Sequence, residues 1–309
     1  MSERRSVGFL SESRGAAAVL GAGILAAAAL VLYTAHGATF AVDELYYYGR
    51  VAVREGGLIH YPSAFDPHYL LAPFNGHLAL GGRFIYELVF ATLGANYTVF
   101  LLIDFTGIAL SAILVFTLIH RRIGTPAALA PCLLLLFLGF AREQFLWPID
   151  FNSSLALATG LGAVLALQRQ DLRGDLLGFV LLSISAAMIE VGVAFGVGIA
   201  VMILIQPSRW RRLWIVIVPA VLYAAWWLWA TPRFGGSETE LSNIVLVPKA
   251  FLHGLGGTLG ALTGTNPVVP GSTGGEVTWF GGGLAILAAL ALAVRIRIGS
   301  LPISGSRYR

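Results

Sequence analysis

The chain has 309 residues, of which 57% are hydrophobic and only 12% are charged, and its formal net charge is +4. This composition excludes an ordinary soluble globular domain, in which about a quarter of the residues are charged. The apolar residues form long runs that do not alternate with polar residues. In a bilayer such runs form helices, because a helix provides hydrogen bonds for its own backbone N–H and C=O groups. We therefore predict an all-α polytopic membrane protein with one integral membrane domain over residues 1–309.

Further classes are excluded by missing motifs. The single cysteine, Cys132, rules out an intrachain disulfide and a thiolate metal site. The sequence has no GxxxxGK loop and no basic stripe, so we expect no ATP-driven chemistry and no nucleic-acid partner. Arg4 and Arg5 precede the first apolar run, but that run is too long and too distant for a cleaved signal, so an uncleaved first span is favoured.

About eight membrane-spanning helices are predicted from the apolar runs. Two of them are short helices within residues 176–205 that meet at Glu190, because this stretch is too long for one crossing and contains an acid. The sequence leaves open whether residues 244–262 form a span or a surface helix. The other predicted spans lie near residues 16–34, 97–119, 126–140, 149–167, 213–230 and 280–294.

The basic residues predict the orientation, since cytoplasmic loops carry an excess of positive charge. With two short helices in 176–205, fourteen of the twenty Lys and Arg residues fall on one side, which we assign to the cytoplasm together with the N-terminus. A single helix there would place the cluster at Arg209–Arg212 on the opposite side. The acidic residues collect mainly on the outer side, where two long loops are expected, residues 35–96 and 231–279.

The first outer loop is rich in aromatic residues, and its part from Leu78 to Val89 has helical spacing. Arg83 and Glu87 lie on the side of this helix opposite its apolar residues. We predict an amphipathic helix at the outer membrane interface.

The acidic pair Asp43-Glu44 follows the first span and is followed by Tyr46, Tyr47 and Tyr48. One carboxylate at this boundary could take a proton from an acceptor hydroxyl while a lipid-anchored donor lies against the tyrosines. Equally, the pair could cap a helix beginning at Leu45, because carboxylates stabilise helix N-termini. The residues alone support both interpretations.

Two histidines on the same loop are candidates for donating to a phosphate or relaying a proton, His77 within Pro73-Phe74-Asn75-Gly76-His77 and, more weakly, His68. The alternative for each is an ordinary polar residue at the interface.

Charged residues elsewhere on the outer side could bind a phosphate. Arg142-Glu143 lies next to Trp147, and an arginine suits a phosphate through its forked donors, although the pair could also simply lie at the interface with Trp147 in an aromatic belt. Glu190 is costly at membrane depth unless it has a partner or lines a cavity.

Two features lie nearer to the spans. Asp104 falls within a predicted span, where it serves either proton-coupled transport or a hydrogen bond to a neighbouring helix. The tryptophans at positions 226, 227 and 229 are interpreted as an interfacial belt.

The order of these features, from about Thr39 to Trp229, resembles the C-type membrane glycosyltransferases, such as protein O-mannosyltransferases and lipid A sugar transferases. The pattern is more closely similar to that of a group of uncharacterised actinobacterial multi-spanning proteins, which carry the motifs Asp-Glu-aromatic and Pro-x-Asn-x-His. The resemblance implies that a sugar carried on polyprenyl phosphate is the donor and that Asp43 is the catalytic base, with Glu44 in support. The acceptor would be an envelope glycan, lipid or protein.

Under this hypothesis the protein resides in the bacterial cytoplasmic membrane, and no cofactor is implied beyond the donor lipid. The need for a divalent metal stays open, because no metal-ligand spacing is present. The substrate-binding residues would be Tyr46, Tyr47, His68, His77, Arg83, Arg142, Glu143 and Glu190. The alternatives are a transporter or flippase subunit that uses Asp104 and Glu190, and a non-catalytic remnant of the glycosyltransferase fold.

Overall fold

A computed structural model of the chain describes residues 3–40, 53–55, 58–60, 63–137, 146–206, 209–234 and 245–249, together with 254, 283, 286–287 and 290. The chain forms two compact units, Met1–Glu238 and Thr239–Arg309. The second unit contributes few described residues, so the prediction of one domain over 1–309 stays a prediction. The fold below is that of the first unit.

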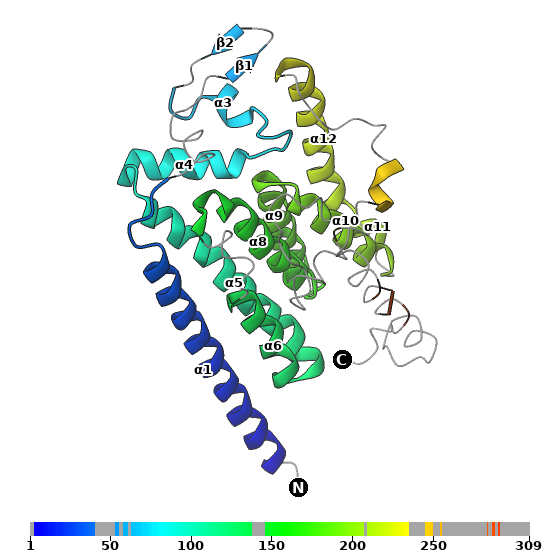
Figure 1. Cartoon of the computed structure of the whole chain (residues 1–309). Helices are drawn as coiled ribbons and strands as arrows, with labels where there is room; N and C mark the ends of the chain where they lie inside the picture. Colours follow the sequence, from blue (N-terminus) through cyan, green and yellow to red (C-terminus); the bar gives the residue numbers. More distant parts are fainter. Residues whose placement is uncertain are drawn as a thin grey trace. The chain divides into compact units, whose positions relative to one another are not determined.

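The first unit is a helical bundle with one small β-hairpin (Figure 1). Strands β1 (Val53–Glu55) and β2 (Leu58–His60) pair antiparallel. A short 3-10 turn, η2 (Pro148–Asp150), precedes α8. The helices are α1 (Glu3–Thr34), α3 (Pro67–Leu71), α4 (Leu80–Leu93), α5 (Tyr97–Ile123), α6 (Thr125–Phe137), α8 (Phe151–Leu167), α9 (Leu172–Met188), α10 (Val191–Leu204), α11 (Arg209–Arg212) and α12 (Trp214–Phe234).

Four helical segments among the described residues are long and apolar enough to cross a membrane: Arg14–Thr34, Tyr97–Ile123, Pro148–Leu167 and Trp214–Phe234. At a rise of about 1.5 Å per residue, each is about 30 Å long or longer, which matches the hydrocarbon core. Two further apolar helices, α6 and α10, are shorter. The predicted span at residues 280–294 and the undecided segment 244–262 lie mostly outside the described residues.

The break within residues 176–205 is confirmed. Helix α9 ends at Met188 and α10 begins at Val191, so that the two helices form a hairpin around Ile189 and Glu190. Gly192 permits the sharp reversal, because a Cβ atom there would collide with the backbone of Ser185 and Ala186. Both ends of the hairpin consequently lie at the same end of the bundle.

Successive helices run in alternating directions. Helices α5 and α8 begin at one end, where Phe100 packs on Phe151, and α12 begins at the other end, where Ile215 packs on Leu167 and Ile203. Helix α4 lies across the end of the bundle at which α5 and α8 begin, and it contacts α8 and α9 (Figure 1). Six of the arginines predicted to share one side therefore do lie at one end of the bundle, at the end of α5, around the start of α9 and on α11: Arg121, Arg122, Arg169, Arg173, Arg211 and Arg212.

The two faces of α4 point the opposite way from the prediction. Arg83 and Glu87 are each only 1% exposed, whereas Phe84 and Leu88 on the other side are 48% and 46% exposed. The expected arrangement, with the charged side directed to water, is wrong, because the charged side packs into the unit together with Tyr86 and Val89. In a membrane protein this inversion is reasonable, since exposed apolar side chains can face lipid.

Candidate functional site

The sequence Pro73-Phe74-Asn75-Gly76-His77 folds into a tight two-residue turn. Phe74 and His77 exchange two backbone hydrogen bonds of 2.9 Å, and both central residues have positive φ, 48° at Asn75 and 80° at Gly76. Asn-Gly is the preferred pair for such a turn, because both residues tolerate the left-handed region. The turn fixes His77 at the end of the loop that leads into α4.

His77 meets Glu190 from the helix break. The distance from His77 Nδ1 to Glu190 Oε2 is 3.4 Å, and the side chains are 38% and 50% exposed. Glu190 also accepts backbone hydrogen bonds at its carbonyl oxygen from Val193 and Ala194, which fixes it at the start of α10. Two of the predicted substrate-binding residues, chosen from separate segments, therefore lie together.

Two glycines bring α4 close enough to the other helices for this pairing. A Cβ atom at Gly81 would lie 2.7 Å from Met188 Sδ, at the end of α9. A Cβ atom at Gly82 would overlap the buried side chain of Asn152 in α8. The Gly81-Gly82 pair therefore allows the backbone of α4 to rest directly on α8 and α9.

Arg83 anchors the same loop from inside. Its guanidinium donates hydrogen bonds to the carbonyl oxygens of Tyr69 and Pro73, the second at 3.3 Å, and lies 4.7 Å from the centre of the Tyr69 ring. These contacts hold the loop against α4 from the inside. They show a structural role for Arg83, which was predicted to bind substrate.

Helix α12 closes the other side of the loop. The Nε1 atom of Trp226 donates to the Leu71 carbonyl oxygen at 2.8 Å, and Trp226 is only 8% exposed. Tyr223, one turn earlier, packs in the same cluster as Leu78 and Trp226, with its ring centre 5.3 Å from that of Trp226. The belt interpretation is therefore wrong for Trp226, which secures the loop.

Besides Arg83 and this pair, the described part of the chain contains one more predicted site residue, His68. His68 is exposed on α3, where its backbone N–H donates to the Asp66 carboxylate that caps the helix. The predicted base and the residues grouped with it lie outside the described residues: Asp43, Glu44, Tyr46, Tyr47, Arg142 and Glu143.

Asp104 is buried between α5 and α8. It is 1% exposed, and neither carboxylate oxygen has a hydrogen-bond partner of normal geometry among the described residues. Ser154 lies near enough to interact with the carboxylate, yet its hydroxyl donates to the Phe151 carbonyl oxygen at 3.2 Å. The helices meet tightly one turn further on, because a Cβ atom at Gly107 would lie 2.5 Å from Ser154 Oγ. The carboxylate is thus enclosed by packed helices.

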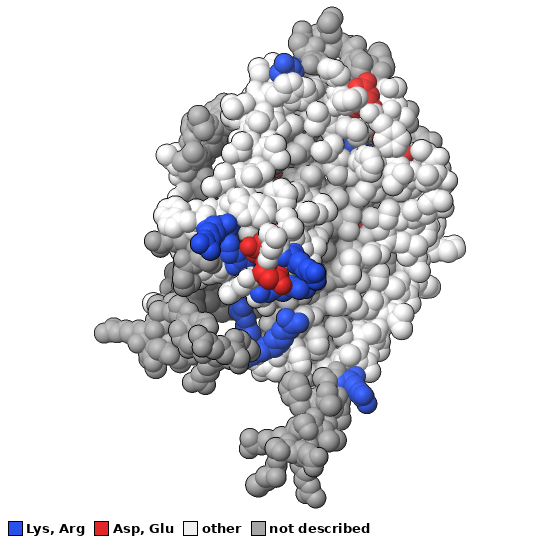
Figure 2. Space-filling view, turned by 180° about the vertical axis from the view of Figure 1, so that it is seen from behind, with Lys and Arg blue, Asp and Glu red and all other residues white. Residues whose placement is uncertain are grey.

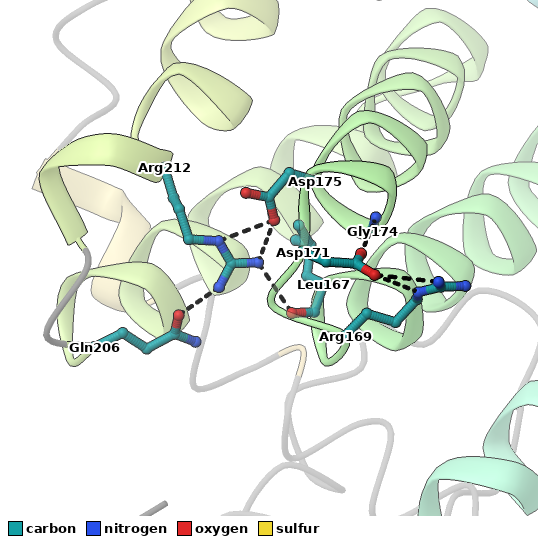
Figure 3. A network of polar contacts seen from close by, with 7 residues as sticks. All are labelled: Leu167, Arg169, Asp171, Gly174, Asp175, Gln206 and Arg212. Carbon is teal, nitrogen blue, oxygen red and sulfur yellow. Dashed lines mark hydrogen bonds and ion pairs between the residues drawn. The ribbon is translucent and has the colours of Figure 1, made fainter.

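A polar network at the opposite end of the bundle was missed by sequence reasoning (Figure 3). Arg212 is 4% exposed and binds Asp175 Oδ1 through Nε at 3.0 Å and Nη2 at 2.6 Å. It also donates to the Leu167 carbonyl oxygen at 2.9 Å and to the Gln206 side chain. One guanidinium therefore joins the ends of α8 and α10 to the start of α9. In the sequence, the arginines at 209–212 indicated only on which side of the membrane this segment lies. No signal in the sequence selects Asp175 as the partner of Arg212.

Asp171 caps α9 beside this network. Its carboxylate accepts from the Gly174 N–H at 2.6 Å and from Arg169 Nη2 at 3.1 Å. These two contacts, the backbone bond first, hold the pKa of Asp171 below its ordinary value.

No group of three or more His, Cys, Asp or Glu side chains that could hold a metal ion occurs among the residues that the structure describes. Comparison with known proteins found no matching family model, no similar curated protein and no similar solved structure.

Proposed function

We propose that the protein is a membrane glycosyltransferase that moves a sugar from a polyprenyl-phosphate donor to a cell-envelope acceptor. The observation that carries this proposal is the contact between His77 and Glu190, which places a histidine and a carboxylate together where the first outer loop meets the helix break. Sugar transfer needs a group that removes a proton from the acceptor and groups that accommodate charge on the leaving phosphate.

The proposed roles divide between two sets of residues. Asp43 is the base and Glu44 supports it, while Tyr46 and Tyr47 lie against the donor lipid. His77 donates to the donor phosphate, and Glu190 fixes the orientation of the histidine ring, as a carboxylate does when it accepts from a ring nitrogen. Arg142, with Glu143 beside it, supplies the positive charge that a phosphate needs.

The wider architecture belongs to the same proposal. We infer about eight spans, with α6, α9 and α10 crossing the bilayer beside the four long helices and the eighth near residues 280–294. Helix α4 would lie at the outer interface with its apolar side toward lipid. The arginine-bearing end of the bundle and the N-terminus would be cytoplasmic, in a bacterial inner membrane.

A second function is favoured by one observation only, the enclosed carboxylate of Asp104. An ionised group inside a membrane protein is costly unless it binds an ion or a proton, so Asp104 suits a transporter or flippase. Glu190, at the break between two short helices, would be the second ion site.

The test uses membranes from cells that produce the full chain, supplied with polyprenyl-phosphate sugars, with mass spectrometry of the donor lipid as the readout. We expect the wild-type protein to convert the donor to free polyprenyl phosphate and Asp43→Asn to lower the rate by about a hundredfold or more. His77→Gln should lower it as well. His36→Gln, an exposed histidine elsewhere on the chain, is the matched control and should leave the rate unchanged.

The opposite pattern would favour transport. Full donor conversion by Asp43→Asn at normal protein levels would contradict the proposed base. If Asp104→Asn then abolishes substrate or ion uptake in the same cells, the transporter hypothesis replaces the enzyme. If Asp43→Asn and Asp104→Asn both leave transfer and uptake intact, the non-catalytic remnant is favoured.

A further inference from the structure

Several arginines gather where α8 ends and α9 begins, and the two acids among them are already bound. Asp175 is held by Arg212, and Asp171 is held by the Gly174 N–H and Arg169. We call Arg169, Arg173, Arg211 and Arg212 the arginine cluster. Figure 2 shows basic atoms gathered closely around acidic atoms on one part of this face, while most of the helix surface carries no charge.

Two members of the arginine cluster have positive charge that no described carboxylate neutralises. Arg173 and Arg211 are both exposed, and within the described part of the chain neither forms a salt bridge. Arg173 lies near Asp171, but the oxygens of that carboxylate already accept from Gly174 and Arg169. The cluster therefore has a net positive charge, and three of its four arginines are exposed.

The buried contacts of Arg212 keep this charge in place. Because its guanidinium binds Asp175, Leu167 and Gln206, the short helix α11 is fixed against the start of α9. Arg211 on α11 and Arg173 on α9 are thus presented from two elements held together by one guanidinium. An anion that reaches either arginine therefore meets an element whose position is already fixed.

Large apolar side chains stand beside these arginines. Leu172 is 70% exposed, Ile205 is 72% exposed, and Trp210 is 74% exposed. Tryptophan and leucine next to arginine at the end of a membrane helix fit the boundary between hydrocarbon and headgroups. A soluble anion would use only the arginines, whereas a phospholipid would use both kinds of side chain.

We propose that the arginine cluster binds the phosphate of an anionic phospholipid from the surrounding bilayer. Arg173 and Arg211 contact the phosphate, and Leu172, Ile205 and Trp210 lie along the glycerol and the upper acyl chains. Arg212 is a positioning residue. Basic pockets between membrane helices select anionic headgroups in this way.

The experiment measures lipid binding to the full chain in detergent by native mass spectrometry, with phosphatidylglycerol and phosphatidylcholine as probes. An arginine that contacts the bound phosphate directly strengthens binding about fivefold, so the double variant R173Q/R211Q should bind phosphatidylglycerol about 25-fold more weakly. The matched control is R121Q/R122Q, which removes the same charge from the last turn of α5 at the same end of the bundle. Its binding should change less than twofold.

Three results would overturn the proposal: unchanged phosphatidylglycerol binding by R173Q/R211Q, equal weakening in both double variants, or full competition by millimolar inorganic phosphate. The last result would identify a soluble anion as the ligand. The wild-type protein provides a test that does not depend on a variant folding. It should prefer phosphatidylglycerol to phosphatidylcholine at least tenfold at low salt and lose that preference at high salt, and equal binding of the two lipids would also overturn the proposal.

Discussion

His77 Nδ1 lies 3.4 Å from Glu190 Oε2, which joins the tight turn before α4 to the hairpin of α9 and α10. Water reaches both side chains, which are 38% and 50% exposed, so solvent screens the attraction between them. Pairs of this kind contribute about 0–1 kcal/mol to stability. The contact therefore matters more for where it places the histidine than for the stability of the bundle.

A double-mutant cycle checks this expectation. We predict that His77→Gln, Glu190→Gln and the double variant unfold at similar temperatures in detergent, with a coupling free energy below about 1 kcal/mol. In the transfer assay the double variant should be no worse than His77→Gln alone, because Glu190 acts through the histidine. A coupling above about 2 kcal/mol would instead identify the pair as a structural support.

The Arg212–Asp175 pair is expected to behave in the opposite way. Both side chains are largely buried, so Asp175→Asn or Arg212→Ala leaves a buried group without its counter-charge, at a cost of about 3–5 kcal/mol. Arg212→Lys should also destabilise, since one ammonium cannot reach Asp175, Leu167 and Gln206 together. Thermal unfolding of the purified variants measures this. The exposed pair of Arg169 and Asp171 is the control, and Arg169→Gln should change the unfolding temperature little, because solvent screens this pair.

Helix positions and the break at Glu190 could be predicted because both depend on local features. The long apolar run from Tyr97 gave the position of α5, and an acid within residues 176–205 marked the reversal. Charge counting correctly grouped Arg169 with the arginines at 209–212, since a hairpin of two helices returns the chain to the same end.

The orientation of α4 and the pairing of distant side chains could not be predicted. Helical spacing shows that Arg83 and Glu87 share a face, but not whether that face meets water or the loop carbonyls that Arg83 binds. Likewise, His77 and Glu190 each suggested a polar site, and only the packing of Gly81 on Met188 brings them together. Tertiary contacts of this kind have no periodic pattern in the sequence.

Asp171 predicts a dependence of stability on pH. Because its pKa is lower in the folded chain than in the unfolded one, its contribution is complete above the unfolded value of about 3.9 and is lost as the pH falls through the folded value. We expect Asp171→Ala to lower the unfolding temperature at pH 7 and to differ less and less from wild type below about pH 4. A difference that stays constant down to pH 3 would contradict this account.

Trp226 should hold the loop before α4 in place. Trp226→Phe keeps most of the ring but removes the donor to the Leu71 carbonyl oxygen, which is half-buried, and the loss of such a hydrogen bond costs about 1 kcal/mol. We expect faster proteolysis between residues 63 and 79 and a lower unfolding temperature. Trp229→Phe, whose ring packs beside Phe234 and Arg233, is the control and should change proteolysis little.

Gly192 and Gly196 lie one turn apart on α10 and should respond oppositely to the same substitution. A Cβ atom at Gly192 would meet the backbone of Ser185 and Ala186, which no side-chain movement can relieve, so Gly192→Ala should force the hairpin apart. Nothing lies within 4 Å of a Cβ atom at Gly196, and alanine is favoured over glycine within a helix by about 1 kcal/mol. Gly196→Ala should therefore match or exceed the wild-type unfolding temperature, while Gly192→Ala should be strongly destabilised and lose transfer activity. Equal stability of the two variants would mean that α9 and α10 do not approach as closely as described, and the position of Glu190 opposite His77 would then lose its physical basis.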